Sequence, residues 1–170
     1  MEVETRNEPA TLWIMLDVSN CMRGATIESA LNVLRQYVLG PLSGSGKKVS
    51  LITFGNTASL LTENPVEVED FIIPNEFNIG GLCNLSDAIS ICKTKVQAKD
   101  EVLVLTKGYT TDSYGDRKSS VDNNCHIVLL DCAASKIPVY LNSYFSGHVC
   151  VYNMQDKSLD ELTKHLSGNQ

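Results

Sequence analysis

The chain has 170 residues, of which 43% are hydrophobic and 20% charged, and its formal net charge is -6. A chain of this length and composition is expected to fold as a single domain over residues 1–170, with a polar N-terminal tail at residues 1–9. Its acidic balance and scattered basic residues argue against nucleic-acid binding, and its apolar runs are too short to span a membrane.

The six cysteines show no spacing that is typical of a metal or redox motif. No C-x-x-C pair occurs, so the sequence predicts neither a zinc ribbon nor a thioredoxin-like site. The first residues are polar and acidic, unlike a secretory signal peptide, and the cytoplasm is therefore the expected compartment. Thiols are expected to be reduced there.

The first half of the chain alternates apolar runs with a helical pattern. Residues 12–16 form a continuous apolar run, which is typical of a strand buried on both faces. A helix is predicted from Gly24 to Leu39, ended by Gly40-Pro41. Residues 49–54 form a second buried strand, and a turn then leads to an antiparallel neighbour at residues 57–61.

The second half repeats this alternation. Asn84 or Ser86 can cap a helix that runs to about Val96. The other predicted elements are strands at 102–106, 127–130 and 149–152, a short helix around 133–142 and a last helix from Ser158. Buried strands joined by helical crossovers predict a three-layer α/β fold, a doubly wound and mostly parallel, Rossmann-like sheet with one antiparallel edge strand.

Ligands of an open parallel sheet bind beyond the carboxyl ends of its strands. The first strand ends there in Asp-Val-Ser-Asn-Cys-Met (17–22), without the glycine fingerprint of a dinucleotide site. Two further stretches fall at such ends, namely Gly-Leu-Cys-Asn-Leu (81–85) and Leu-Thr-Lys-Gly (105–108). A dinucleotide-binding enzyme is therefore disfavoured.

These three stretches resemble the loop motifs of von Willebrand factor A domains, which read Asp-x-Ser-x-Ser, Gly-Gly-Thr-Asn-Leu and Leu-Thr-Asp-Gly. The resemblance covers nearly the whole chain and implies the fold of that family and a role in protein binding. Residues 22–34 and 52–54 look most like the bacterial branch linked to tellurite resistance. That likeness implies intracellular partners, such as a phosphatase or kinase of the same system.

In this family the three loops form a metal-ion-dependent adhesion site for magnesium or manganese, held by serines, a threonine and aspartates. The resemblance places Cys21 at the second serine, Cys83 at the threonine and Lys107 at the second aspartate, so that only Asp17 and Ser19 remain as metal ligands. Magnesium prefers hard oxygen donors, and thiols are soft. No cofactor is therefore expected, and magnesium or manganese is disfavoured.

Three interpretations of the altered site stay open. In the first the site is decayed, Lys107 forms an ion pair with Asp17 and the thiols pack as apolar groups. In the second the site binds a protein partner without metal, and the Lys107 ammonium receives an acidic side chain of the partner. The residues expected to contact the partner are Asp17, Ser19, Cys21, Cys83, Asn84 and Lys107.

The third interpretation uses the thiols. Lys107 would lower the pKa of Cys21 or Cys83, and the two cysteines would bind zinc with Asp17 or act in redox sensing.

Catalysis is not expected. His126, His148 and His165 lie away from the three loops and are predicted to be surface or packing residues, and Cys125 and His126 point to opposite faces of a strand. The segment 108–125 is polar and is expected to be a loop that contacts partners. The sequence therefore favours a non-catalytic protein-interaction module, with a thiol or zinc redox site as the alternative.

Overall fold

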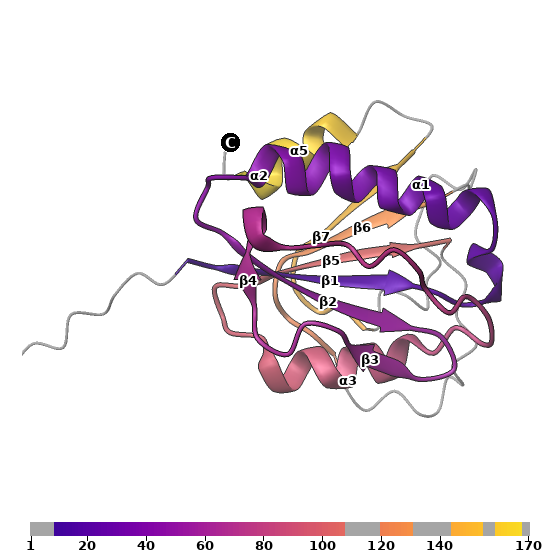
Figure 1. Ribbon diagram of the computed structural model, residues 1–170. Coiled ribbons are helices and arrows are strands. Elements are labelled where there is room, and N and C mark those ends of the chain that lie inside the picture. The colour runs from indigo at the N-terminus through magenta and orange to yellow at the C-terminus, as the bar shows by residue number, and fades with distance from the viewer. Residues whose placement is uncertain (1–8, 108–119, 131–143, 155–158, 168–170) are drawn as a thin grey trace, which may run out of the picture.

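A computed structural model describes residues 9–107, 120–130, 144–154 and 159–167. These residues form a seven-stranded sheet between helices, in the order β3-β2-β1-β5-β6-β7, with β4 also paired to β2 (Figure 1). The architecture is the predicted three-layer, doubly wound α/β fold.

The parallel part of the sheet is built around β1 (Thr11–Asp17), all of whose residues are buried. Its side chains alternate between two halves of the core: Leu12, Ile14 and Leu16 face one side, and Trp13 and Met15 the other. The remaining parallel strands are β2 (Lys48–Phe54), β5 (Glu101–Thr106), β6 (Cys125–Leu129) and β7 (Val149–Asn153).

The antiparallel edge lies beside β2. The short strand β3 (Ala58–Leu60) pairs with the end of β2, and β4 (Val66–Glu67) pairs with its beginning. The chain reverses direction at Gly55-Asn56, where Gly55 donates its N–H to the carbonyl of Thr57 at 3.0 Å. The predicted antiparallel neighbour is therefore confirmed.

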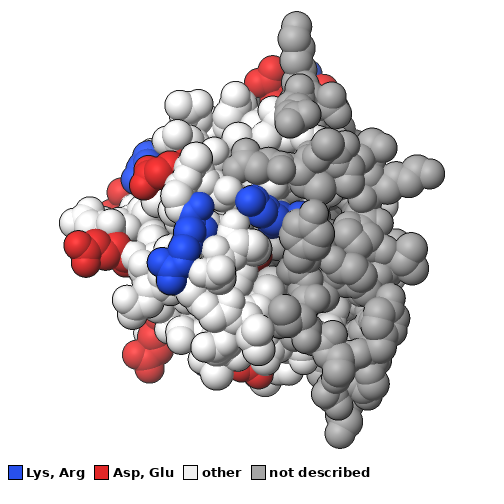
Figure 2. All heavy atoms as spheres, turned by 90° about the vertical axis from the view of Figure 1, so that its right-hand side faces the viewer, with Lys and Arg blue, Asp and Glu red and all other residues white. Residues whose placement is uncertain are grey.

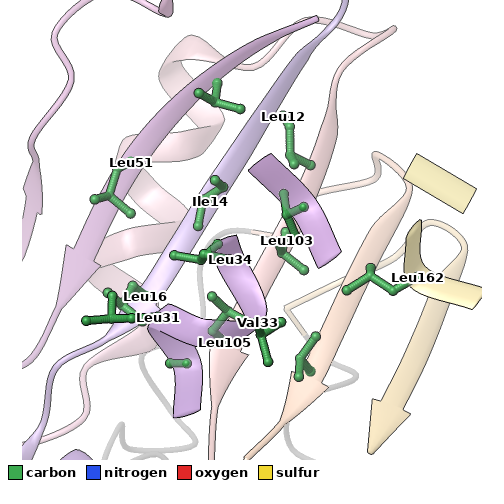
Figure 3. Packing of buried hydrophobic residues seen from close by; sticks show 14 of the residues in the cluster. Leu12, Ile14, Leu16, Leu31, Val33, Leu34, Leu51, Leu103, Leu105 and Leu162 are labelled. Atoms are coloured by element: carbon green, nitrogen blue, oxygen red, sulfur yellow. The ribbon is translucent and has the colours of Figure 1, made fainter. Parts of the chain in front are cut away.

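Helices cover both faces of the sheet (Figure 1). Helix α1 (Ala25–Val33) and helix α5 (Leu159–Leu166) lie on one face, and Leu31, Val33 and Leu34 pack there against the leucines and isoleucine of the strands (Figure 3). Helix α3 (Leu85–Lys95) covers the other face. Its N-cap is Asn84, whose side-chain oxygen accepts the Asp87 N–H at 3.3 Å, as predicted.

One predicted helix end is wrong. The helix does not stop at Gly40-Pro41 but continues through a π-helical turn (Leu34–Leu39) into α2 (Gly40–Leu42). Proline is tolerated because it stands in the first turn of α2, where its missing N–H is not needed. Gly40 fits because a Cβ there would lie 2.9 Å from the carbonyl oxygen of Arg35.

Two predictions fall outside the described residues, namely the short helix around 133–142 and most of the polar loop 108–125. Within the part of the chain that the structure describes, no helix is both long and apolar enough to cross a membrane.

Candidate functional site

The carboxyl ends of β1, β2 and β5 meet at one edge of the sheet, and backbone hydrogen bonds hold the loops there together. Val18 donates its N–H to the carbonyl of Phe54 and accepts the N–H of Gly80, both at 2.9 Å. Asn20 donates its N–H to the carbonyl of Gly81 at 3.0 Å. The first two predicted loops are thereby joined into one surface.

Gly81 is required by its backbone and by its neighbour. Its φ of 79° lies in the left-handed region, and a Cβ on it would lie 2.6 Å from the side-chain atoms of Asn56. Asn56 uses its side-chain oxygen to accept the N–H of Leu82 at 2.8 Å. The second loop is thus fixed against the turn that follows β2.

Asp17 is the centre of the site. Its side chain is fully buried at the end of β1. Oδ1 accepts the backbone N–H of Ser19 at 2.8 Å, and Oδ2 accepts the hydroxyl of Thr106 at 2.8 Å. Buried carboxylates need such donors, and here both oxygens have one.

The two predicted cysteines lie beside the same carboxylate. The Cys83 thiol donates to Asp17 Oδ2 at 3.5 Å, and the Cys21 thiol lies 3.9 Å from that oxygen. The hydroxyl of Ser19 and the thiol of Cys21 are 3.1 Å apart. The structure therefore brings Asp17, Ser19, Cys21 and Cys83 together, as the sequence predicts.

The expected activation of these thiols is not found. Burial, and then the charge of Asp17, raise the pKa of Cys83 far above its ordinary value. Burial also raises the pKa of Cys21. The hydrogen bond with Ser19 and the charge of Lys107 lower this pKa, but by less than burial and the charge of Asp17 raise it. Both groups are therefore held as neutral thiols.

The expected zinc ligands at this edge are also not assembled. Among the described histidine, cysteine and acidic residues, a single group of three brings its ligand atoms within 4.8 Å of one another. That group is His126, Cys150 and His165, and it does not include Asp17, Cys21 or Cys83.

The ion pair between Lys107 and Asp17, which belongs to the first interpretation, is not found. In the described ranges the charged contacts within 4.0 Å are Lys164–Glu161 and, if His126 is protonated, His126–Glu101, and neither involves Lys107. Asp17 and Thr106 lie on the α3 side of the sheet, in the alternation that also places Met15 and Val104 there. Lys107 follows Thr106 and therefore falls on the opposite side of that alternation.

Asn84 lies in the same loop as Cys83 but serves the backbone. It caps α3 with its side-chain oxygen, and its side-chain amide donates to the carbonyl of Asn56 at 3.4 Å. Thr106 is the residue that the sequence interpretation missed. The alternation of side chains along a strand could have identified it. A residue next to Lys107 at the end of β5 points to the opposite face of the sheet from Lys107.

The described part of this edge carries exposed basic side chains. Figure 2 shows the edge from outside, with basic side chains in the middle of the described surface and acidic ones around its margin. Arg23 is exposed, donates to the side chain of Asn20 at 2.6 Å, and lies over Gly80. Leu82 is 61% exposed.

A cavity of about 510 Å³ opens beside the same loops. Its lining includes Val18, Gly55 and Gly80, together with the antiparallel edge strand and the segment from Glu76 to Ile79. The edge therefore offers a hollow, a basic centre and an exposed leucine side by side.

The chain thus belongs to the doubly wound α/β folds, an architecture in which ligands bind at the carboxyl ends of the strands. Neither the models of protein families nor the curated proteins include a match to this chain. Solved structures do match. A von Willebrand factor type A protein from Catenulispora acidiphila is 12% identical with a TM-score of 0.63, covering 94% of this chain and 42% of that one.

Two further solved structures are similar to this chain. The ArnB paralog VWA2 from Sulfolobus acidocaldarius is 17% identical, with a TM-score of 0.62, and covers 94% of this chain and 44% of that one. The SpRpn10 VWA domain is 12% identical, with a TM-score of 0.58 and coverage of 95% and 98%. These likenesses show that the chain has the von Willebrand factor A fold.

Proposed function

We propose that this chain is a non-catalytic protein-interaction module of the von Willebrand factor A type, which binds its partner through the loop edge without a metal ion. The observation that carries the proposal is the separation of Asp17 from Lys107. The carboxylate is buried and hydrogen-bonded, while the ammonium has no ion-pair partner among the described residues.

The donor set at this edge does not fit magnesium or manganese. Both ions prefer several hard oxygen ligands, and magnesium demands a near-octahedral shell. Two of the family positions carry sulfur, at Cys21 and Cys83, and both thiols are held neutral by their surroundings. Asp17 and Ser19, the two residues that match the oxygen donors of the family motif, already form hydrogen bonds within the protein.

The chemistry of the edge favours an acidic partner. Lys107 at the end of β5 and Arg23 in the first loop each bring a positive charge to this edge, so a partner carboxylate would be attracted to it. The exposed Leu82 offers an apolar contact next to that charge. Asn84 and Ser19 are proposed to shape this surface through the backbone of the loops.

The proposal also includes the cellular compartment, the cytoplasm, and the bacterial system to which the chain belongs. Protonated thiols at Cys21 and Cys83 fit the reducing cytoplasm. The sequence likeness of residues 22–34 and 52–54 to the tellurite-resistance branch supports a role within that bacterial system.

A matched pair of lysine variants tests the proposal. A protein captured by the wild-type chain is purified, and its affinity is measured for wild type, K107A and K95A. Lys95 is exposed at the end of α3 and provides the same charge change away from the loop edge. K107A is expected to weaken binding by about tenfold or more, and K95A to leave it unchanged. Equal affinities of K107A and wild type would refute the charge-based site.

Calorimetric titration of Mg²⁺ and Mn²⁺ into the reduced chain tests the metal-free half of the proposal. No heat of binding at the loop edge is expected. Tight binding that D17N abolishes would instead mean that a working adhesion site is present.

A further inference from the structure

A second cluster of chemically active side chains lies under helix α5, in the first half of β6 and β7. His126 on β6 and Cys150 on β7 are direct partners in the parallel register. Tyr152 follows two residues after Cys150 and therefore shares its face of the sheet. His165 reaches the same place from α5.

The two imidazoles point at one phenol oxygen. His126 Nδ1 lies 3.1 Å from the Tyr152 hydroxyl oxygen, and His165 Nδ1 lies 2.6 Å from it. The ligand atoms of His126, Cys150 and His165 all lie within 4.8 Å of one another. Three segments distant in sequence thus direct two nitrogens and one sulfur into one small volume.

The ring of His126 is buried between the Tyr152 hydroxyl, which lies at Nδ1, and a carboxylate, which lies near Nε2. Only 5% of its side chain is exposed, and its Nε2 has no hydrogen-bond partner among the described residues. That nitrogen lies 3.7 Å from the carboxylate of Glu101. A metal-bound histidine commonly directs its second ring N–H at a carboxylate, which fixes the tautomer and leaves the other nitrogen free to bind.

We propose that His126, Cys150 and His165 form a zinc site, which fastens helix α5 to strands β6 and β7. Two imidazoles and a thiolate are ligands that zinc prefers. A tetrahedral site places its ligand atoms roughly 3.3–3.8 Å apart, so the cluster needs to close by about 1 Å. The Tyr152 oxygen, 3.1 Å and 2.6 Å from the two Nδ1 atoms, is closer to them than a ligand of a tetrahedral site would be, so it must move outward when zinc binds.

The surroundings of the cluster favour a cation. The carboxylate of Glu101, 3.7 Å from His126 Nε2, adds negative charge that stabilises a bound Zn²⁺. His165 is exposed and Cys150 half-buried, so the ion can reach the site from solvent. Binding releases the thiol proton of Cys150 to solvent.

This site is independent of the proposed partner-binding edge, because it uses none of the loop residues around Asp17. A zinc titration of the reduced, metal-stripped full chain tests it, with wild type compared with C150S, H165Q and C21S. C21S is the matched control, since Cys21 is also a half-buried thiol but lies at the loop edge. Circular dichroism checks that each variant is folded.

Wild type and C21S are expected to bind one Zn²⁺ per chain, and C150S and H165Q to bind it at least about tenfold more weakly. With Co²⁺ as the probe, the thiolate-to-cobalt absorption band is expected in C21S and absent in C150S. Zinc is also expected to raise the unfolding temperature of wild type and not of C150S.

No stoichiometric binding, or equal binding by C150S and wild type, would overturn the site. Loss of binding in C21S but not in C150S would also overturn it and would transfer the metal to the loop thiols.

Discussion

The Thr106 hydroxyl donates a 2.8 Å hydrogen bond to Asp17 Oδ2, and this bond joins the ends of β5 and β1 in the buried centre of the loop edge. In one interpretation of the sequence Asp17 forms an ion pair with Lys107, whereas in the structure its side-chain donor is Thr106.

Replacing Thr106 with valine keeps its shape and removes the donor. A hydrogen bond to a charged group contributes about 1.5–3 kcal/mol, so T106V is expected to lower the free energy of unfolding by about that amount. Urea denaturation measures it. T106S keeps the hydroxyl and is expected to lose less. If T106V and T106S were equally stable, the bond to Asp17 would not matter for stability.

The loop edge depends on Gly81 for two separable reasons. Gly44 has nearly the same φ, 80°, but nothing lies within 4 Å of a Cβ there. G44A should therefore lower the free energy of unfolding by only the left-handed strain, about 1–2 kcal/mol. G81A should lower it by about 1–3 kcal/mol more, because of the clash with Asn56. Equal losses in the two variants would contradict the clash.

Asp100 is, besides Asp17, the other buried carboxylate among the described residues. It accepts the N–H groups of Thr11 at 2.9 Å and Gln97 at 2.9 Å and the indole N–H of Trp13 at 3.0 Å. D100N places an amide donor among these donors and is expected to lower the free energy of unfolding by at least about 2 kcal/mol. Trp13 is the chain's single tryptophan, so its fluorescence reports the change directly.

D122N is the control for D100N, because Asp122 is exposed and lies outside any helix or strand. It should change stability by no more than about 0.5 kcal/mol. A stability of D100N within that margin would show that the three donors do not need the carboxylate.

Stability is expected to fall in alkaline solution. Burial, aided by the charge of Asp100, raises the pKa of Cys92 to about 12, and burial raises the pKa of Cys125 well above its ordinary value. Unfolded thiols ionise near pH 8.5, so above that pH the unfolded chain binds fewer protons than the folded one. The stability that the protonated thiols of Cys92 and Cys125 contribute is fully present below about pH 8.5 and is lost as the pH rises towards 12.

Urea denaturation between pH 7.5 and 10 measures this decline. C92A removes one of the titrating thiols and should show a shallower fall, by up to about 1.4 kcal/mol per pH unit. Identical slopes for C92A and wild type would mean that Cys92 ionises as readily in the folded state as in the unfolded one.

The sheet could be predicted from the sequence because its strands are continuous apolar runs, as in β1, and its antiparallel edge follows a short turn after β2. The end of the first helix could not be predicted, because the sequence places it at Gly40-Pro41. Local propensity stops a helix at such a pair, whereas a π-helical turn shifts the hydrogen bonds so that Pro41 begins a new turn.

The site was predicted in part, for a similar reason. Motifs at strand ends place Asp17, Ser19, Cys21 and Cys83 together, because parallel strands end at one edge. The partners of each side chain depend on the strand alternation, and that alternation assigns Thr106 to Asp17. The cluster of His126, Cys150 and His165 depends on the register of β6 and β7 and on the docking of α5, which no local pattern encodes.

The split antiparallel edge has a consequence for behaviour at high concentration. A long exposed strand can recruit another copy of the chain and start aggregation. Here β3 has three residues and β4 has two. Pro65 and the exposed Glu63 lie between the two strands, and Glu67 at the end of β4 is exposed as well. This side of the sheet therefore offers no continuous template for fibre growth, and the protein is protected there against edge-to-edge polymerisation.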